Sequence, residues 1–201
     1  MPRIQAASVA EHHARQRRAL LDAAHALLAE TAQAPSMAAV GRRAGLARTS
    51  VYQYFASAEE LLAAVVADVF PTWAGQVLER VAAAPTPASR VWAYVVANVD
   101  LFASSEQAVA RALTQVVEPR VLQGPMEEFH ARLQGPLRQA LADFGEPEPE
   151  TMAELVDVLI VRASQEVGSA AARPDNAAVR DLTLARLRRL LGPYLGLGRQ
   201  D

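Results

Sequence analysis

The side chains best suited to contact another molecule gather in one short stretch of this 201-residue chain. Arginine and glutamine have the right hydrogen-bonding forks for guanine and adenine in the DNA major groove, and hydroxyl groups suit phosphate oxygens. The candidate DNA-binding residues of this stretch are Arg48, Thr49, Ser50, Tyr52, Gln53 and Tyr54. We expect Arg48 and Gln53 to read bases; the alternative is a solvated helix face with two half-buried tyrosines.

The segments around this stretch predict a helix-turn-helix. Two short helices are expected over 37–44 and 48–54, joined by a tight turn in which Gly45 can take a positive φ. Val51 and Phe55 would hold the second of these helices against its neighbours, which leaves its polar face outward. An α-helix that presents such a face fits the major groove.

Three further residues could add phosphate contacts. Arg42 and Arg43 lie on the expected helix 37–44, where an exposed helix face explains them about as well. Ser36 precedes that helix and is expected first to cap it and only second to bind a phosphate.

Apolar residues recur at helical spacing along nearly the whole chain, and no stretch alternates as a strand does. The fold class is therefore all-α. About nine helices are expected, over 9–31, 37–44, 48–54, 58–82, 87–103, 105–117, 125–144, 148–172 and 175–191. We place an N-terminal three-helix domain in residues 1–56 and a larger helical domain in residues 57–201.

Charge is distributed unevenly along the chain. Residues 1–55 carry seven arginines and three acidic residues, a net charge of +4. The remainder carries 13 arginines and 19 acidic residues, a net charge of −6. A basic N-terminal part on an acidic body indicates that the N-terminus meets a polyanion. An uneven surface without such a partner is the alternative.

Several other classes of protein are disfavoured. The chain has no cysteine, which excludes disulfides and thiol catalysis and suits a cytoplasmic protein. No uninterrupted run approaches the roughly 20 apolar residues that span a bilayer, and the N-terminus lacks the apolar core of a secretory signal. His12, His13 and His25 have no carboxylate at ligand spacing, and no catalytic constellation stands out. We expect no metal, no cofactor, no membrane partner and no enzymatic activity.

Residues 17–62 resemble the N-terminal pattern of the TetR (tetracycline repressor) family of bacterial transcription regulators. The matching positions are Arg17, Leu20, Leu21, Ala23, Ala24, Leu27, Leu28, Ser36, Val40, Ala44, Gly45, Leu46, Ser50, Val51, Tyr52, Tyr54, Phe55, Glu59 and Leu61. At five positions the chain departs from the residues usual in that family, namely Ala32, Gly41, Ala47, Thr49 and Ala58. Ala47 stands for a helix-capping serine, whose loss typically costs about 1 kcal/mol. The departures predict an altered set of DNA contacts.

The resemblance also implies what residues 57–201 do: they would bind a small-molecule effector and form a homodimer. Large apolar residues could line an effector pocket, although plain core is the better explanation for any single one of them. The pocket candidates are Phe70, Trp73, Trp92, Val95, Val96, Val99, Phe102, Met126, Phe129, His130 and Leu133. The last two helices would pair with those of a second subunit. The dimer candidates are Leu155, Leu159, Gly168, Ala171, Leu184, Leu187, Arg188 and Leu191.

Together these features predict a dimeric, ligand-responsive DNA-binding transcription regulator. We expect a repressor that a small, lipophilic effector releases from a palindromic double-stranded operator. The alternative is an all-helical module of the same fold that binds a small molecule or a protein and whose DNA binding is weakened. Ala47 and Ala58 motivate that alternative.

Overall fold

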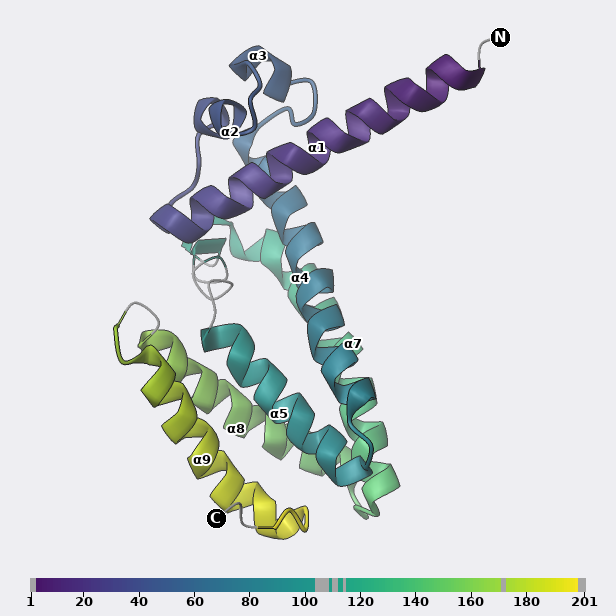
Figure 1. The fold of residues 1–201 in the computed structure, drawn as a ribbon, viewed down its shortest axis with the longest axis vertical. Coiled ribbons are helices and arrows are strands. Elements are labelled where there is room, and N and C mark those ends of the chain that lie inside the picture. The colour runs from purple at the N-terminus through teal and green to yellow at the C-terminus, as the bar shows by residue number, and fades with distance from the viewer. Residues whose placement is uncertain (1–2, 104–108, 110–111, 114, 171–172, 199–201) are drawn as a thin grey trace. The chain divides into compact units, whose positions relative to one another are not determined.

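Figure 1 shows a computed structural model of the chain, which describes residues 3–103, 109, 112–113, 115–170 and 173–198. The side chains of residues 3–8, 102 and 103 lie outside that description. The described residues form helices and no strand, as the all-α prediction requires. The helices are α1 (Arg3–Thr31), α2 (Met37–Arg43), α3 (Arg48–Val51), α4 (Ala58–Ala83), α5 (Pro87–Ala103), α7 (Pro119–Phe144), α8 (Pro149–Ser169) and α9 (Asn176–Tyr194).

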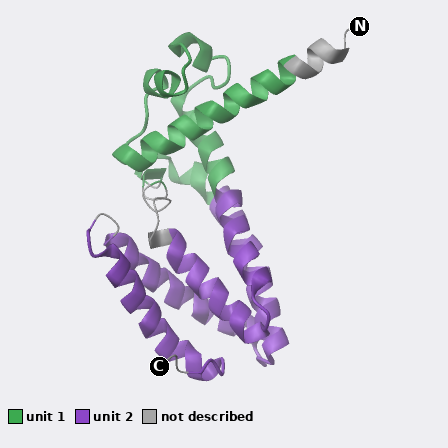
Figure 2. Cartoon of the chain, in the orientation of Figure 1, with its two compact units in different colours: residues 1–69, 108–123 green, residues 70–107, 124–201 purple. Residues whose placement is uncertain are grey.

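The chain divides into two compact units, coloured separately in Figure 2. The first unit comprises residues 1–69 and 108–123, and the second comprises residues 70–107 and 124–201. Helix α4 thus begins in the first unit and ends in the second. These units reflect packing, so the functional boundary expected after residue 56 stays a prediction.

The first unit is built on the apolar stripe of α1. Leu20 and Leu28 of α1 are fully buried, as are Val40 of α2 and Val51 of α3. Helix α2 packs against both α1 and α3. Burial of several large aliphatic side chains, each worth about 1.5–3 kcal/mol, fixes these three helices as one body.

The second unit has a core shared by five helices. Helix α5 packs against α8 and α9, which also pack against each other, and parts of α4 and α7 complete the core. Val95, Leu137 and Val156 are completely or almost completely buried there. The unit is therefore a helical bundle with its own hydrophobic core.

Several helix boundaries differ from the expected ones. Helix α1 begins at residue 3 rather than 9, and α7 begins at Pro119 rather than 125. Proline is well tolerated at the first position of a helix, where its missing N–H has no intrahelical partner. Gly124 and Pro125 lie inside α7, because burial of its apolar stripe outweighs the low helix propensity of glycine and proline. The expected helix 105–117 falls largely on residues outside the described part.

Helix α4 is the most apolar long helix. Its most apolar 18-residue window has a mean hydropathy of 1.5, enough to cross a membrane by length and composition alone. Half of that window is buried inside the fold, and Val65, Val66 and Val77 are fully or almost fully buried. This burial is the expected property of a core helix. Pro71 lies inside α4, which continues to Ala83.

Ala32, where the family usually has a glycine nearby, ends α1 in a conformation that favours glycine. Its φ is +51°, and its N–H donates to the carbonyl oxygen of Leu28 at 2.9 Å. A single bond of this kind at a left-handed residue is a common helix end, usually made by glycine. A left-handed alanine costs roughly 1–2 kcal/mol.

We therefore expect Ala32→Gly to raise the free energy of unfolding by about 1 kcal/mol, after the larger entropy of an unfolded glycine is subtracted. Urea denaturation followed by circular dichroism measures the change. Ala34→Gly is the matched control, because Ala34 does not have a positive φ. It should lower stability or leave it unchanged. Equal effects of the two substitutions would contradict the explanation.

Candidate nucleic-acid interface

The turn between α2 and α3 depends on one left-handed glycine. Gly45 has a φ of +71°, and its N–H donates to the carbonyl of Arg42 at 3.3 Å. The N–H of Leu46 donates to the carbonyl of Gly41 at 2.8 Å. These two bonds form a Schellman motif, which ends α2 and redirects the chain sharply into α3.

Gly41 allows α2 and α3 to approach closely. A Cβ atom at this position would lie 2.9 Å from the carbonyl oxygen of Leu46 and 2.9 Å from Cγ2 of Val51. Both contacts are too short for a side chain, and one of them is to backbone. Alanine, the residue usual in the family at this position, would therefore not fit here. Gly41 leaves the space that the Val51 side chain occupies.

Helix α3 is shorter than expected. It spans Arg48–Val51, and residues 52–54 form a turn rather than a continuation of the helix. Its N-cap, Ala47, makes no side-chain hydrogen bond, so the orphan N–H groups of the first turn lack a side-chain acceptor. The expected end at residue 54 is wrong, because an uncapped helix with β-branched Thr49 and Val51 has little local stability.

The six predicted DNA-binding side chains nevertheless lie on one continuous segment, α3 and the turn that follows it. Val51 is 0% exposed and Phe55 is 2% exposed, so both anchor the segment inward as expected. The six candidate residues are exposed to different degrees. Arg48, Thr49, Tyr52 and Gln53 are exposed, whereas Ser50 and Tyr54 are half-buried.

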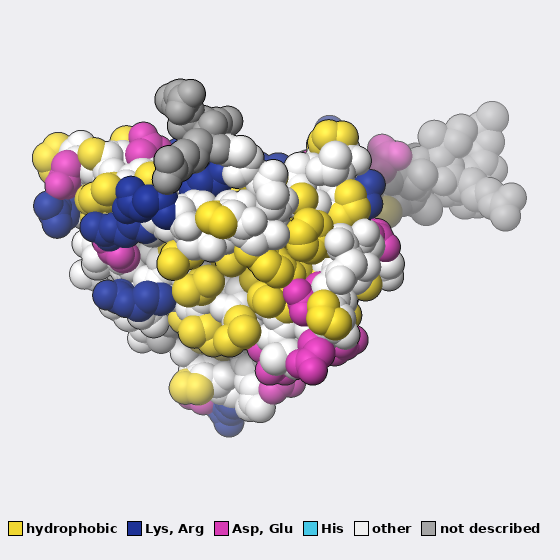
Figure 3. All heavy atoms as spheres, turned by 90° about the horizontal axis from the view of Figure 1, so that it is seen from below, with side chains coloured by type: hydrophobic (Ala, Val, Ile, Leu, Met, Phe, Trp, Pro, Cys, Tyr) yellow, Lys and Arg dark blue, Asp and Glu magenta, His cyan; other side chains and the backbone are white. Residues whose placement is uncertain are grey.

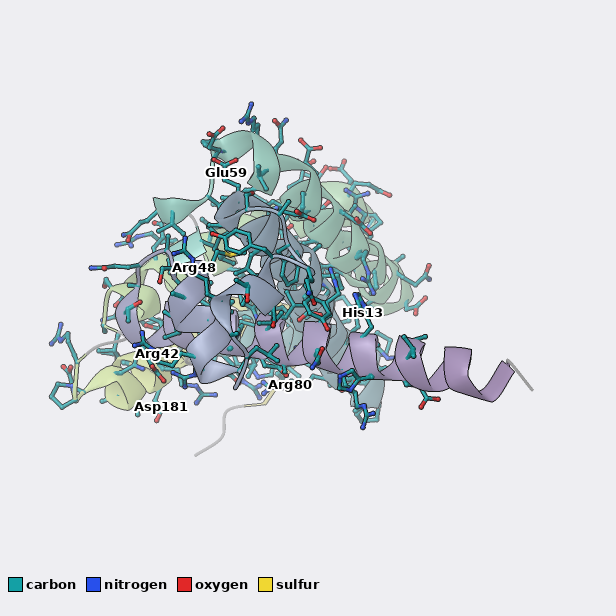
Figure 4. All side chains as sticks on the ribbon, turned by 90° about the horizontal axis from the view of Figure 1, so that it is seen from above. His13, Arg42, Arg48, Glu59, Arg80 and Asp181 are labelled. Carbon is teal, nitrogen blue, oxygen red and sulfur yellow. The ribbon has the colours of Figure 1, made fainter. Side chains whose placement is uncertain are left out.

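Arg48 and Tyr52 form a pair on the outer side of α3. Nη2 of Arg48 donates to the Tyr52 hydroxyl at 3.4 Å, and the guanidinium carbon lies 5.8 Å from the centre of the Tyr52 ring. Positions four apart face each other on a helix, so the ring limits the directions that the guanidinium can take. Figure 4 shows Arg48 on α3 together with Arg42 on α2 and His13 on α1.

The two arginines of α2 differ in their surroundings. Arg43 donates from both terminal nitrogens to the carboxylate of Glu30 on α1, each at 2.7 Å, and these bonds lower the pKa of Glu30. Arg42 is exposed, and no hydrogen bond or ion pair of its side chain occurs among the described residues. Arg43 therefore joins α1 to α2, while Arg42 is the better placed of the two to meet a phosphate.

Ser36 acts as a helix cap. Its Oγ accepts the N–H of Ala39 at 3.2 Å, and its backbone is extended as an N-cap requires. The hydroxyl proton is not used in that bond, so a phosphate contact remains open to Ser36 as a second role.

Helix α1 contributes contacts to this surface that the sequence did not indicate. The Tyr54 hydroxyl donates to Oε1 of Gln16, and the rings of Tyr54 and His13 lie 4.5 Å apart. One position further along α1, the guanidinium of Arg17 lies 5.3 Å from the centre of the Phe55 ring. Positions 13, 16 and 17 share one helix face, and this spacing is the signal that could have found them.

The pocket candidates differ in their surroundings. Phe70 lies 5.4 Å from Trp73 and 5.5 Å from Phe129, and Phe129 lies 5.7 Å from His130, all measured between ring centres. This aromatic cluster joins α4 to α7 within the second unit. Val95, Val99 and Leu133 are core residues, Trp92, Val96 and Met126 are half-buried, and the Phe102 side chain lies outside the described residues.

A partly buried polar network that the sequence did not indicate connects α5, α7 and α8. Asp157 accepts from the Tyr94 hydroxyl at 3.1 Å and from Nε2 of Gln134 at 2.7 Å, and Arg138 donates to Gln134. Burial and the Asp157 carboxylate raise the pKa of Tyr94, so its hydroxyl stays a donor. Networks of this kind fix the relative positions of packed helices when their members are paired.

The dimer candidates are not equally available to a partner. Leu187 is 5% exposed and Leu191 is 7% exposed, and both belong to the core of their own chain, while Gly168 is buried. Leu159 and Leu184 pack partly against that core, and Arg188 lies over the Trp92 ring at 5.0 Å. Ala171 lies outside the described residues. Of the candidates that the structure describes, Leu155 alone is exposed, to 56%.

Apolar side chains that the sequence did not single out are exposed on the same two helices. Val158 and Val161 on α8 are 66% and 55% exposed, and Leu182 and Leu190 on α9 are 50% and 63% exposed. Figure 3 shows one face of the molecule, on which hydrophobic side chains gather between acidic side chains and arginines.

Among the residues that the structure describes, no group of three histidine or acidic side chains could hold a metal ion.

The comparisons with known proteins agree with this geometry. Residues 20–65 match the family model of bacterial regulatory proteins of the tetR family. No curated protein matches the chain as a whole or in part. The matched segment contains α2, α3, the turn between them and most of the buried stripe of α1.

Solved structures of transcriptional regulators share the fold. FadR from Bacillus subtilis in complex with stearoyl-CoA is 15% identical, with a TM-score of 0.64 over 85% of this chain and 96% of that one. A regulator from Rhodococcus sp. Rha1 is 20% identical, with a TM-score of 0.63 over 86% and 96%. AibR in complex with isovaleryl coenzyme A and operator DNA is 16% identical, with a TM-score of 0.60 over 85% and 97%.

Proposed function

Residues 20–65 of this chain match the tetR family of bacterial regulatory proteins, and from that premise we propose that the chain is a homodimeric, cytoplasmic repressor of transcription. Its N-terminal unit would bind a palindromic DNA operator, and a small lipophilic effector in the second unit would release it. The observation that carries the proposal is the outward polar face of residues 48–53, anchored from behind by Val51 and Phe55.

DNA binding by this surface is supported by the chemistry of its side chains. Arg48 and Gln53 are exposed and able to form paired hydrogen bonds with base edges. Arg42 adds an exposed cation from α2, in the part of the chain whose net charge is +4. Phosphate contacts by arginines release counterions, so binding should weaken steeply as salt is added.

The direct test is a selection of DNA duplexes from a random library by the full-length chain. We expect a palindromic sequence to be enriched and its affinity to fall about tenfold or more between 50 and 200 mM salt. Fluorescence anisotropy of the enriched duplex measures both. Enrichment of no sequence at low salt would refute the proposed function.

An effector site in the second unit is supported by the aromatic cluster of Phe70, Trp73, Phe129 and His130. Apolar and aromatic walls with a few polar groups are typical of small-molecule sites. Two regulators of similar fold are described in complexes with stearoyl-CoA and isovaleryl coenzyme A. These two thioesters are therefore suitable first probes for release of the enriched duplex.

A second candidate function is favoured by one observation, the unsupported start of α3. Ala47 provides no cap and α3 has only four residues, which fits a helical binding module whose DNA affinity is weakened. Binding of a thioester probe by a chain that enriches no duplex would favour this second function.

A further inference from the structure

The hydroxyl of Tyr54 is already committed to another residue. It donates its proton to Oε1 of Gln16, and the Tyr54 ring packs against the tilted His13 ring, with the ring centres 4.5 Å apart. A phenol has one O–H donor, and the oxygens of a phosphodiester only accept hydrogen bonds. While the bond to Gln16 persists, Tyr54 has nothing to donate to a DNA backbone.

The bond leaves the donor side of Gln16 available. Its amide carries two N–H bonds on Nε2, and Oε1 is the atom that accepts from Tyr54. No acceptor for Nε2 occurs among the residues that the structure describes. Tyr54 therefore orients the Gln16 amide by holding its oxygen, which fixes the direction of the two remaining donors.

The neighbours of Gln16 on α1 also suit the phosphates of a DNA backbone. His13 is exposed beside Tyr54, and the exposed guanidinium of Arg17 lies 5.3 Å from the centre of the Phe55 ring. These three residues occupy one face of α1 next to the turn that follows α3. An imidazole, an amide and a guanidinium in a row offer hydrogen-bond donors to successive phosphate oxygens.

We propose that Gln16 of α1 is a phosphate-binding residue of the DNA interface and that Tyr54 is its positioning residue. The inference rests on the proposed function and specifies how the same surface holds the DNA backbone. It reverses the direct contact expected of Tyr54 from the sequence. Because a phosphate carries no base identity, Gln16 contributes affinity and register but no sequence preference.

The test compares full-length variants on the duplex that the wild-type chain enriches. Gln16→Met keeps the length of the side chain and removes the amide, so we expect affinity to fall about tenfold or more for every duplex, with the base preference unchanged. Tyr54→Phe should cause a smaller loss, and the double variant should bind like Gln16→Met, because the two residues act as one unit. Gln76→Met, at an exposed glutamine of α4, is the matched control and should bind like wild type.

Phosphate-ethylation interference provides a readout that a merely structural role would not change. In each half-site, ethylation of one phosphate should block binding by the wild-type chain. Ethylation of the same phosphate should not change binding by Gln16→Met. If the Tyr54 hydroxyl is the true donor, removing Gln16 frees it. Affinity would then be kept or increased in Gln16→Met and lost in Tyr54→Phe, which would overturn the inference while leaving the proposed function intact. A wild-type chain that enriches no duplex would overturn both.

Discussion

Replacing Arg48 with alanine is expected to remove discrimination at one base pair of each half-site while leaving the fold unchanged. Arg48 is exposed at the first position of α3, and its guanidinium is steered by the Tyr52 hydroxyl and ring. A paired hydrogen bond to guanine is worth about 1–3 kcal/mol against a wrong base, which is about 5- to 150-fold in affinity. Anisotropy titrations with single-base variants of the enriched duplex measure this ratio.

Arg42→Ala is the matched control for that experiment. Arg42 is also an exposed arginine of the helix-turn-helix, but it is placed to meet a phosphate. Its loss should weaken binding to all duplexes alike and reduce the salt slope by about one. Gln53→Ala should relax preference at a neighbouring base, as Arg48→Ala does at its own. Unchanged preference in both Arg48→Ala and Gln53→Ala would refute a base-reading role for α3.

Introducing two carboxylates on α8 is expected to cause the largest loss of DNA binding. Leu155 and Val158 are 56% and 66% exposed in the chain, so Leu155→Glu with Val158→Glu should leave each subunit folded. At the proposed interface with a second copy, the four carboxylates of a dimer would lose water and face apolar surface. The desolvation cost is several kcal/mol, so the dimer dissociation constant should rise a hundredfold or more.

Sedimentation equilibrium measures the mass of the assembly in solution, and the same samples are titrated with the enriched palindrome. A monomer holds only one half-site, so affinity for the palindrome should fall as the dimer dissociates. Ala142→Glu, an exposed position on α7, is the control and should remain dimeric. If the double variant remains a dimer, the interface does not include this face of α8. Leu187 and Leu191 are unsuitable for this test because they are core residues.

The sequence by itself determined the helical class, the position of the helix-turn-helix and the inward anchors. The spacing of apolar residues shows which face of a helical segment is apolar. Val51 and Phe55 are buried as that spacing predicted. The turn at Gly45 was equally predictable, because a left-handed residue in a tight connection is most often glycine. These properties are local, so a short window of residues contains the information.

The tertiary structure decided which chemically suitable side chains are available. Leu187 and Leu155 are both leucines at helical spacing, yet one is 5% exposed and the other 56%. Periodicity gives the angle between two faces of a helix but not which face another helix covers. The division of labour between Arg42 and Arg43 has the same origin, since only the approach of α1 places Glu30 beside Arg43. The pairing of Gln16 with Tyr54, 38 residues apart, likewise exists only because α1 packs against the turn that follows α3.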